Sequence, residues 1–132
     1  LYVEDHAKAI DMVQEQGRLF ETYNVGGHNE KQNIEIINII IDTLQEMLPA
    51  DDPRRALVSK DLITYVEDRK GHDRRYAIAP DKIKAEIGWY PETDFATGIK
   101  KTIAWFFEHE DWMKNVTSGD YQKYYEDQYG KR

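Results

Sequence analysis

The sequence predicts a mixed α/β fold that is rich in helix, with about five helices and two or three short strands. Apolar residues recur at helical spacing in several segments, and short runs of β-forming residues lie between these segments. A length of 132 residues with 40% hydrophobic residues suits a single folded domain with one core. Because so few strands make a poor sheet alone, we expect sheet partners outside this chain.

The strongest helix signal is an apolar stripe that ends just before Pro49. Asn29, with Gln32 three residues later, has the form of a capping box ahead of this helix. The stripe consists of Ile34, Ile37, Ile41, Leu44 and Leu48.

Other segments carry weaker helix signals. A first helix is predicted from about Glu4, with Ala7, Ile10 and Val13 on one face and a stop at Gly17. The segment "DKIKAEIGW" predicts a short helix that starts near Pro80 and closes at Gly88. A longer helix is expected from Asp94. For the polar, tyrosine-rich tail from Trp112, the sequence allows either a last helix or a loosely held end. The stripe of the longer helix consists of Phe95, Ile99, Thr102, Ile103 and Phe106.

Three stretches have the composition of strands. Tyr2 and Val3 suggest a short strand end, "FETYNV" over residues 20–25 suggests a strand before two glycines, and "DLITYVED" over 61–68 suggests another. Between the last two, "PADDPRR" is predicted to be a surface loop because it combines two prolines with opposed charges.

Composition excludes several classes of function. A net charge of −7 argues against non-specific binding to nucleic acid or to an anionic membrane surface. The chain has no cysteine, which excludes disulfides and thiolate zinc sites and fits a reducing cytoplasm. Its most apolar run, "NIEIINIIIDTL", is too often interrupted by polar residues to span a bilayer, and no secretory signal opens the chain. Since the chain begins without Met, we expect a fragment of something longer.

Catalytic signatures are missing from the sequence. There is no G-x-S-x-G motif, and the four histidines are too widely scattered for a serine triad. No spacing of metal ligands such as H-E-x-x-H occurs, so no metal site is predicted. We therefore predict neither catalytic residues nor metal ligands in this chain.

Two stretches are candidates for binding an anion. Gly26 and Gly27 either present a helix N-terminus to an anion or simply make a tight turn, and their spacing favours the turn. Asn33 also has two interpretations, either as a residue that contacts a ligand or as an ordinary surface residue in the first turns of the helix. In "YVEDRKGHDRRY", over residues 65–76, several cations crowd around one glycine and one histidine. These residues are Arg69, Lys70, Arg74 and Arg75, with Gly71 and His72.

The cationic stretch has two interpretations that composition leaves open. Arginine binds phosphate through a planar fork of donors, and Gly71 would let a ligand approach the backbone closely. His72 can donate a hydrogen bond in either protonation state. Alternatively, the arginines pair with Glu67, Asp68 and Asp73 on a solvated face.

The ordered motifs of the chain resemble a known enzyme family. "LYVEDHAKAI", "ETYNVGGHNEKQNIEII", "ITYVEDRKGHDRRYAI" and "KIKAEIGWYPETDFATGIKKTIAWFFEHEDW" together are similar to the C-terminal half of the dTDP-glucose 4,6-dehydratases. These are nucleotide-sugar enzymes of the extended short-chain dehydrogenase/reductase superfamily. The likeness covers essentially the whole chain, and "D-R-x-G-H-D-x-R-Y-A-I" separates it from epimerases and decarboxylases of the same fold.

The resemblance implies a lyase in two parts. The family's N-terminal Rossmann domain holds NAD, and its C-terminal part closes over the nucleotide-sugar. The family converts dTDP-glucose to dTDP-4-dehydro-6-deoxy-glucose with loss of water, using a Tyr-x-x-x-Lys pair and an Asp-Glu pair. This chain lacks both Tyr-x-x-x-Lys and the glycine fingerprint of the NAD site. Residues 1–132 are therefore expected to be the substrate-binding portion alone, inactive by itself, of an enzyme that is typically a homodimer in the cytoplasm.

The resemblance also assigns binding residues by motif. Asn33 matches a substrate contact, and Asp68, Arg69, Lys70, Gly71 and His72 match the segment around the nucleotide diphosphate and ribose. Arg69 is expected to hold diphosphate oxygens, supported by His72 and Asn33, whereas Arg74 and Arg75 are expected to be structural. The chain departs from the family at Lys70, where Pro is usual, and at Ala79, where Asp is usual and would cap a helix for about 1 kcal/mol.

Two further hypotheses stay open from the sequence. The missing catalytic motifs are also what a non-catalytic nucleotide-sugar binding module would show. The second hypothesis is a related UDP-glucose 4,6-dehydratase. It stays open because selectivity for thymine in the family depends largely on residues outside this chain. No nucleic acid or membrane partner is expected.

Overall fold

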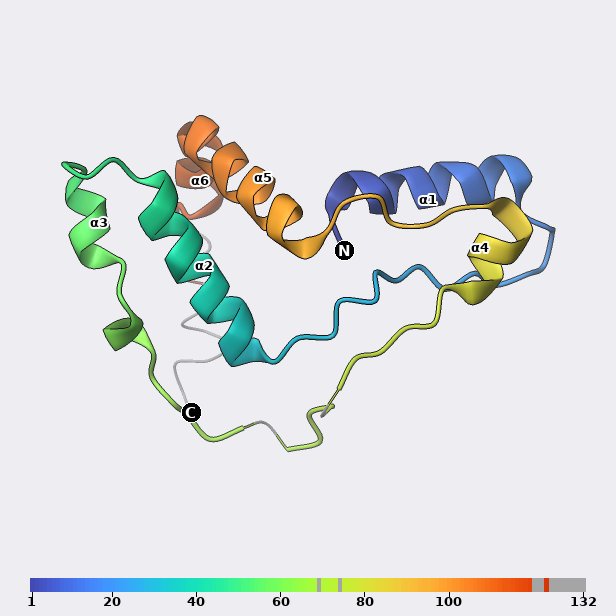
Figure 1. The fold of residues 1–132 in the computed structure, drawn as a ribbon, viewed down its shortest axis with the longest axis horizontal. Helices are drawn as coiled ribbons and strands as arrows, with labels where there is room; N and C mark the ends of the chain where they lie inside the picture. Colours follow the sequence, from blue (N-terminus) through green and yellow to red (C-terminus); the bar gives the residue numbers. More distant parts are fainter. Residues whose placement is uncertain (69, 74, 120–122, 124–132) are drawn as a thin grey trace. The chain divides into compact units, whose positions relative to one another are not determined.

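A computed structural model of the chain describes residues 1–68, 70–73, 75–119 and 123. Six α-helices and one 3-10 helix follow one another along these residues, and no strand occurs among them (Figure 1). The chain divides into two compact units, residues 1–99 and 100–132, and the helix α5 contributes residues to both. The elements are α1 (Val3–Gln16), α2 (Asn33–Met47), α3 (Pro53–Leu57), η1 (Lys60–Leu62), α4 (Asp81–Ile87), α5 (Phe95–Glu108) and α6 (Glu110–Val116).

Helix α1 forms where the sequence predicts it, but its buried face matches the predicted one only in part. The helix begins at Val3 and ends before Gly17, whose N–H donates to the Val13 carbonyl over 2.8 Å. Asp5 and Ala9, one helical turn apart, are its buried residues, whereas Ile10 of the predicted face is 57% exposed. Of the predicted face, Val13 packs against the core, whereas Ala7 and Ile10 are exposed, because the small Ala9 side chain lies against the core in their place.

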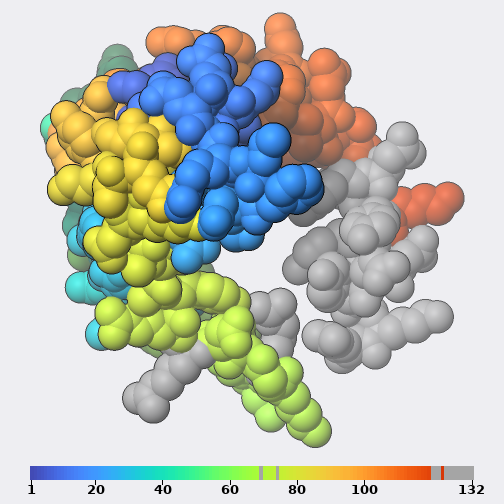
Figure 2. Space-filling model, turned by 90° about the vertical axis from the view of Figure 1, so that its right-hand side faces the viewer, coloured from blue at the N-terminus to red at the C-terminus, as the bar shows by residue number. Residues whose placement is uncertain are grey.

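The core of the first unit joins α1 to α4 and to the chain that follows α4. Ala9 and Ile83 are completely buried, and Trp89 is 1% exposed. Helices α1 and α4 contact each other, and Figure 2 shows the chain from the end of α1 (blue) against the α4 segment (yellow). Met12, Val13, Tyr23 and Val25 pack around this cluster, which Ile87 completes. The core therefore depends on residues about 75 positions apart in the sequence.

Two buried polar contacts fix the chain after α4 onto α1. The Trp89 indole N–H donates to the backbone carbonyl of Asp5 over 3.1 Å, and the Thr93 N–H donates to the Asp5 carboxylate over 2.9 Å. Among the described residues, every buried side-chain N or O atom has a hydrogen-bond partner. Asp5 is thus a structural carboxylate that the hydrophobic pattern of α1 gives no reason to expect.

The ends of α4 differ in how well they were predicted. Gly88 closes the helix in a left-handed conformation with φ 79°, which confirms the predicted stop. The N-cap is Pro80, so Ala79 lies one residue before the cap. The expectation that residue 79 occupies the cap position was therefore wrong, and no lost cap follows from Ala79.

Helix α2 is confirmed, with its capping box three residues later than predicted. The N-cap is Gln32, and its N–H donates to the Glu35 carboxylate over 2.7 Å. At the other end, Leu48 is buried, as the stripe predicts, whereas Ile37 is 39% exposed. The apolar stripe is therefore covered at its C-terminal end and partly open near its start.

The segment predicted as a loop after α2 contains the short helix α3. Asp52 caps it by accepting the Arg54 N–H over 2.8 Å, and Pro53 occupies the first turn, where no N–H is needed. Gln45 of α2 donates to the carbonyls of Arg55 and Val58, which ties the two helices together. Of the two prolines that suggested a loop here, Pro53 begins a helix, whereas Pro49 lies in the connection between α2 and α3.

The segments predicted as strands belong to helices or have no regular structure in the described residues. Tyr2 is the extended N-cap of α1, residues 61–62 belong to η1, and residues 21–25 and 63–68 have no regular structure. A strand is defined by hydrogen bonds to a neighbouring strand, and β-forming composition does not supply that neighbour. The prediction of two or three strands is accordingly not met within the described part of the chain.

Helix α5 forms where the sequence predicts it, and aromatic side chains join its end to α6. Asp94 begins α5 by accepting the Thr97 N–H over 2.8 Å, as predicted. Within residues 100–132, Trp105 and Trp112 meet edge to face with ring centroids 5.1 Å apart, so α6 packs on the end of α5. Residues 112–116 belong to α6, whereas the tyrosine-rich end of the chain lies outside the described residues apart from Lys123, so the choice between a last helix and a loose end stays open there. No helix in the described ranges has the length and apolar character needed to cross a membrane.

Candidate functional site

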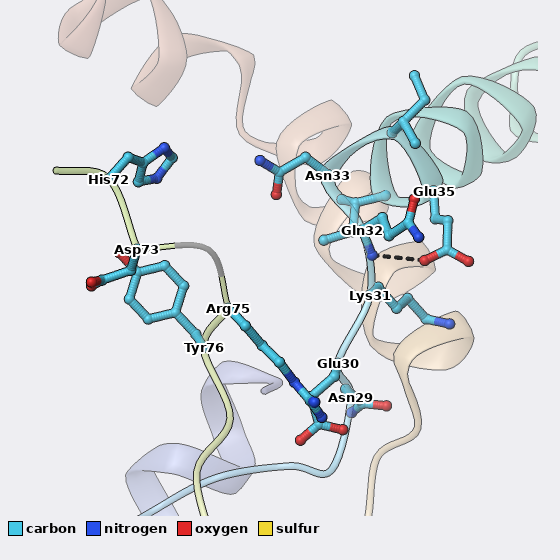
Figure 3. Close-up of a pocket in the computed structure, with 12 residues that line it drawn as sticks. Asn29, Glu30, Lys31, Gln32, Asn33, Glu35, His72, Asp73, Arg75 and Tyr76 are labelled. Carbon is cyan, nitrogen blue, oxygen red and sulfur yellow. Dashed lines mark hydrogen bonds between the residues drawn. The ribbon is translucent and has the colours of Figure 1, made fainter. Parts of the chain in front are cut away.

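An open hollow of about 970 Å³ in the first unit is the main candidate for a binding site. Two segments far apart in the sequence line it, residues 29–36 at the start of α2 and, of residues 72–76, the described residues 72, 73, 75 and 76 (Figure 3). Most of the residues that line it have polar side chains, and both charges are present. It consists of Asn29, Glu30, Lys31, Gln32, Asn33, Ile34, Glu35, Ile36, His72, Asp73, Arg75 and Tyr76.

A close backbone approach brings the two segments together. A Cβ placed on Gly26 would lie 2.9 Å from the Cβ of Ile78, which is closer than real Cβ contacts. Only glycine therefore lets the chain that leads to α2 pass against the chain that leads away from residues 72–76. Five residues separate Gly27 from the start of α2, so the glycine pair makes this contact and forms no phosphate turn. The turn interpretation of Gly26 and Gly27 is the one that this geometry supports.

The second wall of the hollow depends on a turn at Gly71. Gly71 has φ 77°, in the left-handed region that favours glycine. After this turn His72 is half-buried, and its Nδ1 lies 2.7 Å from Oδ1 of Asp68. That contact fixes the imidazole ring, and Figure 3 shows His72 and Asn33 pointing toward one another from opposite walls. The side-chain amide of Asn33 and the second ring nitrogen of His72 can both form hydrogen bonds to a ligand that lies between them.

The structure brings together some of the residues assigned from the sequence. Asn33 and His72 line the hollow, and Asp68 orients His72. Gly71 shapes the turn, and Lys70 is exposed and is not among the lining residues. Arg69, the residue expected to hold diphosphate, lies outside the described residues, and so does Arg74.

Several lining residues were not singled out as ligand contacts by sequence reasoning. Three lining residues are examples: the sequence predicts a structural role for Arg75 and no role for Lys31 or Tyr76. The signal for Arg75 was its place in the cationic stretch, and that for Lys31 was its place beside Asn33. Lys31 Nζ lies 5.6 Å from the Phe95 ring centroid, so an aromatic face also holds this cation.

The hollow offers several kinds of hydrogen-bond donor. Within the described ranges, no group of three His, Asp or Glu side chains is arranged to hold a metal ion. NAD does not fit the residues present either, because a dinucleotide needs a glycine-rich turn directly ahead of a helix and the sequence has no such fingerprint. Cationic, amide and imidazole donors around an open hollow suit a polar ligand that carries anionic oxygens.

Two solved structures that match this fold carry the same enzyme name. A dTDP-glucose 4,6-dehydratase from Bacillus anthracis in complex with NAD matches with a TM-score of 0.73 and 41% identity, over 89% of this chain and 33% of that one. A second from Streptomyces venezuelae, with NAD and another ligand bound, has a TM-score of 0.69 and 34% identity, over 83% and 30% of the two chains. The fold is thus that of a class of nucleotide-sugar dehydratases.

Sequence comparison narrows this class to a family. The chain belongs to the GDP-mannose 4,6 dehydratase family, whose model matches residues 1–102. It is 49% identical over all its 132 residues to a dTDP-glucose 4,6-dehydratase of Shigella flexneri, and 45% identical over 122 residues to one of Neisseria meningitidis. It spans about a third of the length of these relatives, 35% and 34% respectively. The resemblance drawn from the motifs is confirmed.

Proposed function

We propose that residues 1–132 are the C-terminal, substrate-binding portion of a longer dTDP-glucose 4,6-dehydratase, a hydro-lyase. The longer protein would convert dTDP-glucose to dTDP-4-dehydro-6-deoxy-glucose with loss of water, using NAD bound outside these residues. The observation that carries this proposal is the 49% identity, along the entire chain, to a relative of that name. The absence of a glycine fingerprint and of Tyr-x-x-x-Lys from the sequence makes these 132 residues inactive alone.

In this proposal the hollow between α2 and residues 72–76 receives the nucleotide part of the substrate. Asn33 and His72 would donate hydrogen bonds from opposite walls, with Asp68 holding the imidazole. Arg69 and Lys70 would supply positive charge from the same loop, and Gly71 would allow the loop to turn around the ligand. Support for this assignment comes from the shared lining of the hollow and from the family motif.

The wider architecture belongs to the same proposal. The extended segments 21–25 and 63–68, rich in β-forming residues, would pair as strands with a sheet in the rest of the protein. Tyr65 and Val66 are more than 80% exposed within this chain, which is unusual for such residues unless another part of the protein covers them. We further propose that the longer protein is a homodimer, as is typical of the family. We also propose a cytoplasmic location, which the lack of cysteine fits.

The proposal is tested by assaying a full-length protein that contains this chain. With dTDP-glucose as substrate, we expect formation of the 4-keto-6-deoxy sugar nucleotide, followed by mass spectrometry as a loss of one water. The purified 132-residue chain serves as the matched control and should give no product. Turnover of UDP-glucose in place of dTDP-glucose would move the assignment to a sister dehydratase.

A non-catalytic nucleotide-sugar binding module is the second candidate. The sequence feature that favours it is the lack of both Tyr-x-x-x-Lys and a glycine fingerprint in these residues. It predicts that the full-length protein binds the sugar nucleotide without turnover. The region encoded ahead of Leu1 separates the two candidates, since an enzyme requires both Tyr-x-x-x-Lys and a glycine fingerprint there.

A further inference from the structure

Arg75 stands out among the described arginines because its side chain makes neither an ion pair nor a hydrogen bond with a described residue, whereas Arg55 donates to the Leu48 carbonyl. Arg18 Nη2 lies 2.6 Å from the Glu86 carboxylate, and Arg54 Nη2 lies 2.8 Å from that of Asp52. Arg75 lines the hollow and makes no ion pair or side-chain hydrogen bond with any described residue. A guanidinium without a partner beside a polar hollow is available to a ligand.

The carboxylates of the hollow do not take up this charge. Glu35 accepts the N–H of Gln32 over 2.7 Å and is held in the first turn of α2. Figure 3 shows the Asp73 carboxylate turned away from the α2 side of the hollow, and Arg75 extending toward Glu30. Glu30 lines the hollow without forming an ion pair with Arg75 among the described residues. The Arg75 guanidinium on this wall therefore has N–H donors that no described residue uses.

We infer that Arg75 binds oxygens of the substrate's diphosphate, from the wall that faces Asn33. This inference deepens the proposed function and rests on it. The planar guanidinium matches two phosphate oxygens at once, and a diphosphate lying between the walls would meet Arg75 on one side and the donors of α2 on the other. Because no described hydrogen bond or ion pair depends on the Arg75 side chain, we expect its loss to leave the fold intact.

The test compares two ligands that differ only in the diphosphate. Thymidine 5′-diphosphate and thymidine are titrated calorimetrically into the full-length protein and into Arg75→Ala. The dissociation constant for thymidine 5′-diphosphate should rise about tenfold to a hundredfold, the loss expected for hydrogen bonds to a charged group. The constant for thymidine should stay the same, and the midpoint of thermal unfolding should not move.

Two further variants sharpen the comparison. Arg75→Lys keeps the charge without the fork and should recover only part of the affinity for thymidine 5′-diphosphate. Arg54→Ala removes the same charge from α3, away from the hollow, and should leave both constants unchanged.

Three results would overturn the inference. An unchanged constant for thymidine 5′-diphosphate in Arg75→Ala means that the diphosphate is held elsewhere, although the proposed function survives. An equal loss of affinity for both ligands means that Arg75 only shapes the hollow. If the unaltered protein binds neither ligand and forms no product from dTDP-glucose, the proposed function itself fails and this inference fails with it.

Discussion

The packed region around Trp89 and the hollow around Asn33 use polar side chains in opposite ways. In the packed region, Asp5 is buried and its carboxylate accepts the Thr93 N–H. In the hollow, Asn33 and Arg75 are exposed, and their polar groups point into solvent-accessible space. The first region satisfies its own polar groups, whereas the second keeps donors available.

This difference separates residues that hold the fold from residues that bind. A side chain whose hydrogen bonds are all made within the chain has nothing left for a ligand, and its loss destabilises the fold. A side chain on an open wall contributes little to the fold, and its loss is felt only when a ligand is present. Stability and affinity should therefore respond to different substitutions.

The largest expected effect on stability is at Trp89. Because this side chain is 1% exposed and fills the space between α1 and α4, Trp89→Ala should lower the free energy of unfolding by about 3–5 kcal/mol. Urea unfolding of the full-length protein, with hydrogen exchange at the amides of α1 and α4, measures the loss. Trp112→Ala, at a tryptophan that is 48% exposed, is the control and should cost about 1 kcal/mol. Equal losses at both positions would contradict the position of the core.

A smaller effect is expected at Asp5. Asp5→Ala removes the acceptor of the Thr93 N–H and should cost about 1–3 kcal/mol, while Asp5→Asn keeps an acceptor oxygen and should cost less. The same unfolding measurement applies. Asp11→Ala, at an exposed position of the same helix, should change little. If Asp5→Ala instead weakened the binding of thymidine 5′-diphosphate and left stability unchanged, the division between the two regions would fail.

The smallest effect is a dependence of stability on pH at the edge of the packed region. The Tyr23 hydroxyl, which donates to Glu86 over 2.8 Å, and then Arg18 hold the pKa of the Glu86 carboxyl below its usual value of 4.5. Since the folded-state pKa is the lower one, this contribution is present above about pH 4.5 and is lost as the pH falls through the folded-state pKa.

Removing the carboxylate should therefore flatten the acid limb of the stability curve. We expect Glu86→Gln to lower the urea midpoint near neutral pH, and to narrow its difference from the unaltered protein as the pH falls below about 4.5. Glu15→Gln, at an exposed position of α1, is the matched control and should leave the curve unchanged. A constant difference between Glu86→Gln and the unaltered protein at every pH would exclude the ionised carboxylate as the cause.

Local signals predicted the helices well. The stripe before Pro49, the stop at Gly88 and the start at Asp94 each match an observed helix end, because caps and breakers act over a few residues. The short helix α3 was missed because proline serves both a loop and the first turn of a helix. The strands were predicted from composition alone, and composition supplies no partner for a ladder.

The candidate site was only partly accessible to sequence reasoning. Asn33 and His72 were singled out from family motifs and do line one hollow. Arg75 was set aside as structural, because a run of charges does not show which of its members pairs with a neighbour and which faces open space. That choice depends on where the chain turns at Gly71 and on how closely Gly26 approaches Ile78.

By itself, the sequence determined the main helices, the end of α2 before Pro49, the stop of α4 at Gly88, and the family to which the chain belongs. These follow from periodicity, from residues that act locally and from ordered motifs. Only the tertiary structure decided that α1 buries Asp5 and Ala9 and leaves Ile10 exposed, and that residues 29–36 and 72–76 share one hollow. Both outcomes depend on contacts between residues distant in the chain, which no short-range pattern encodes.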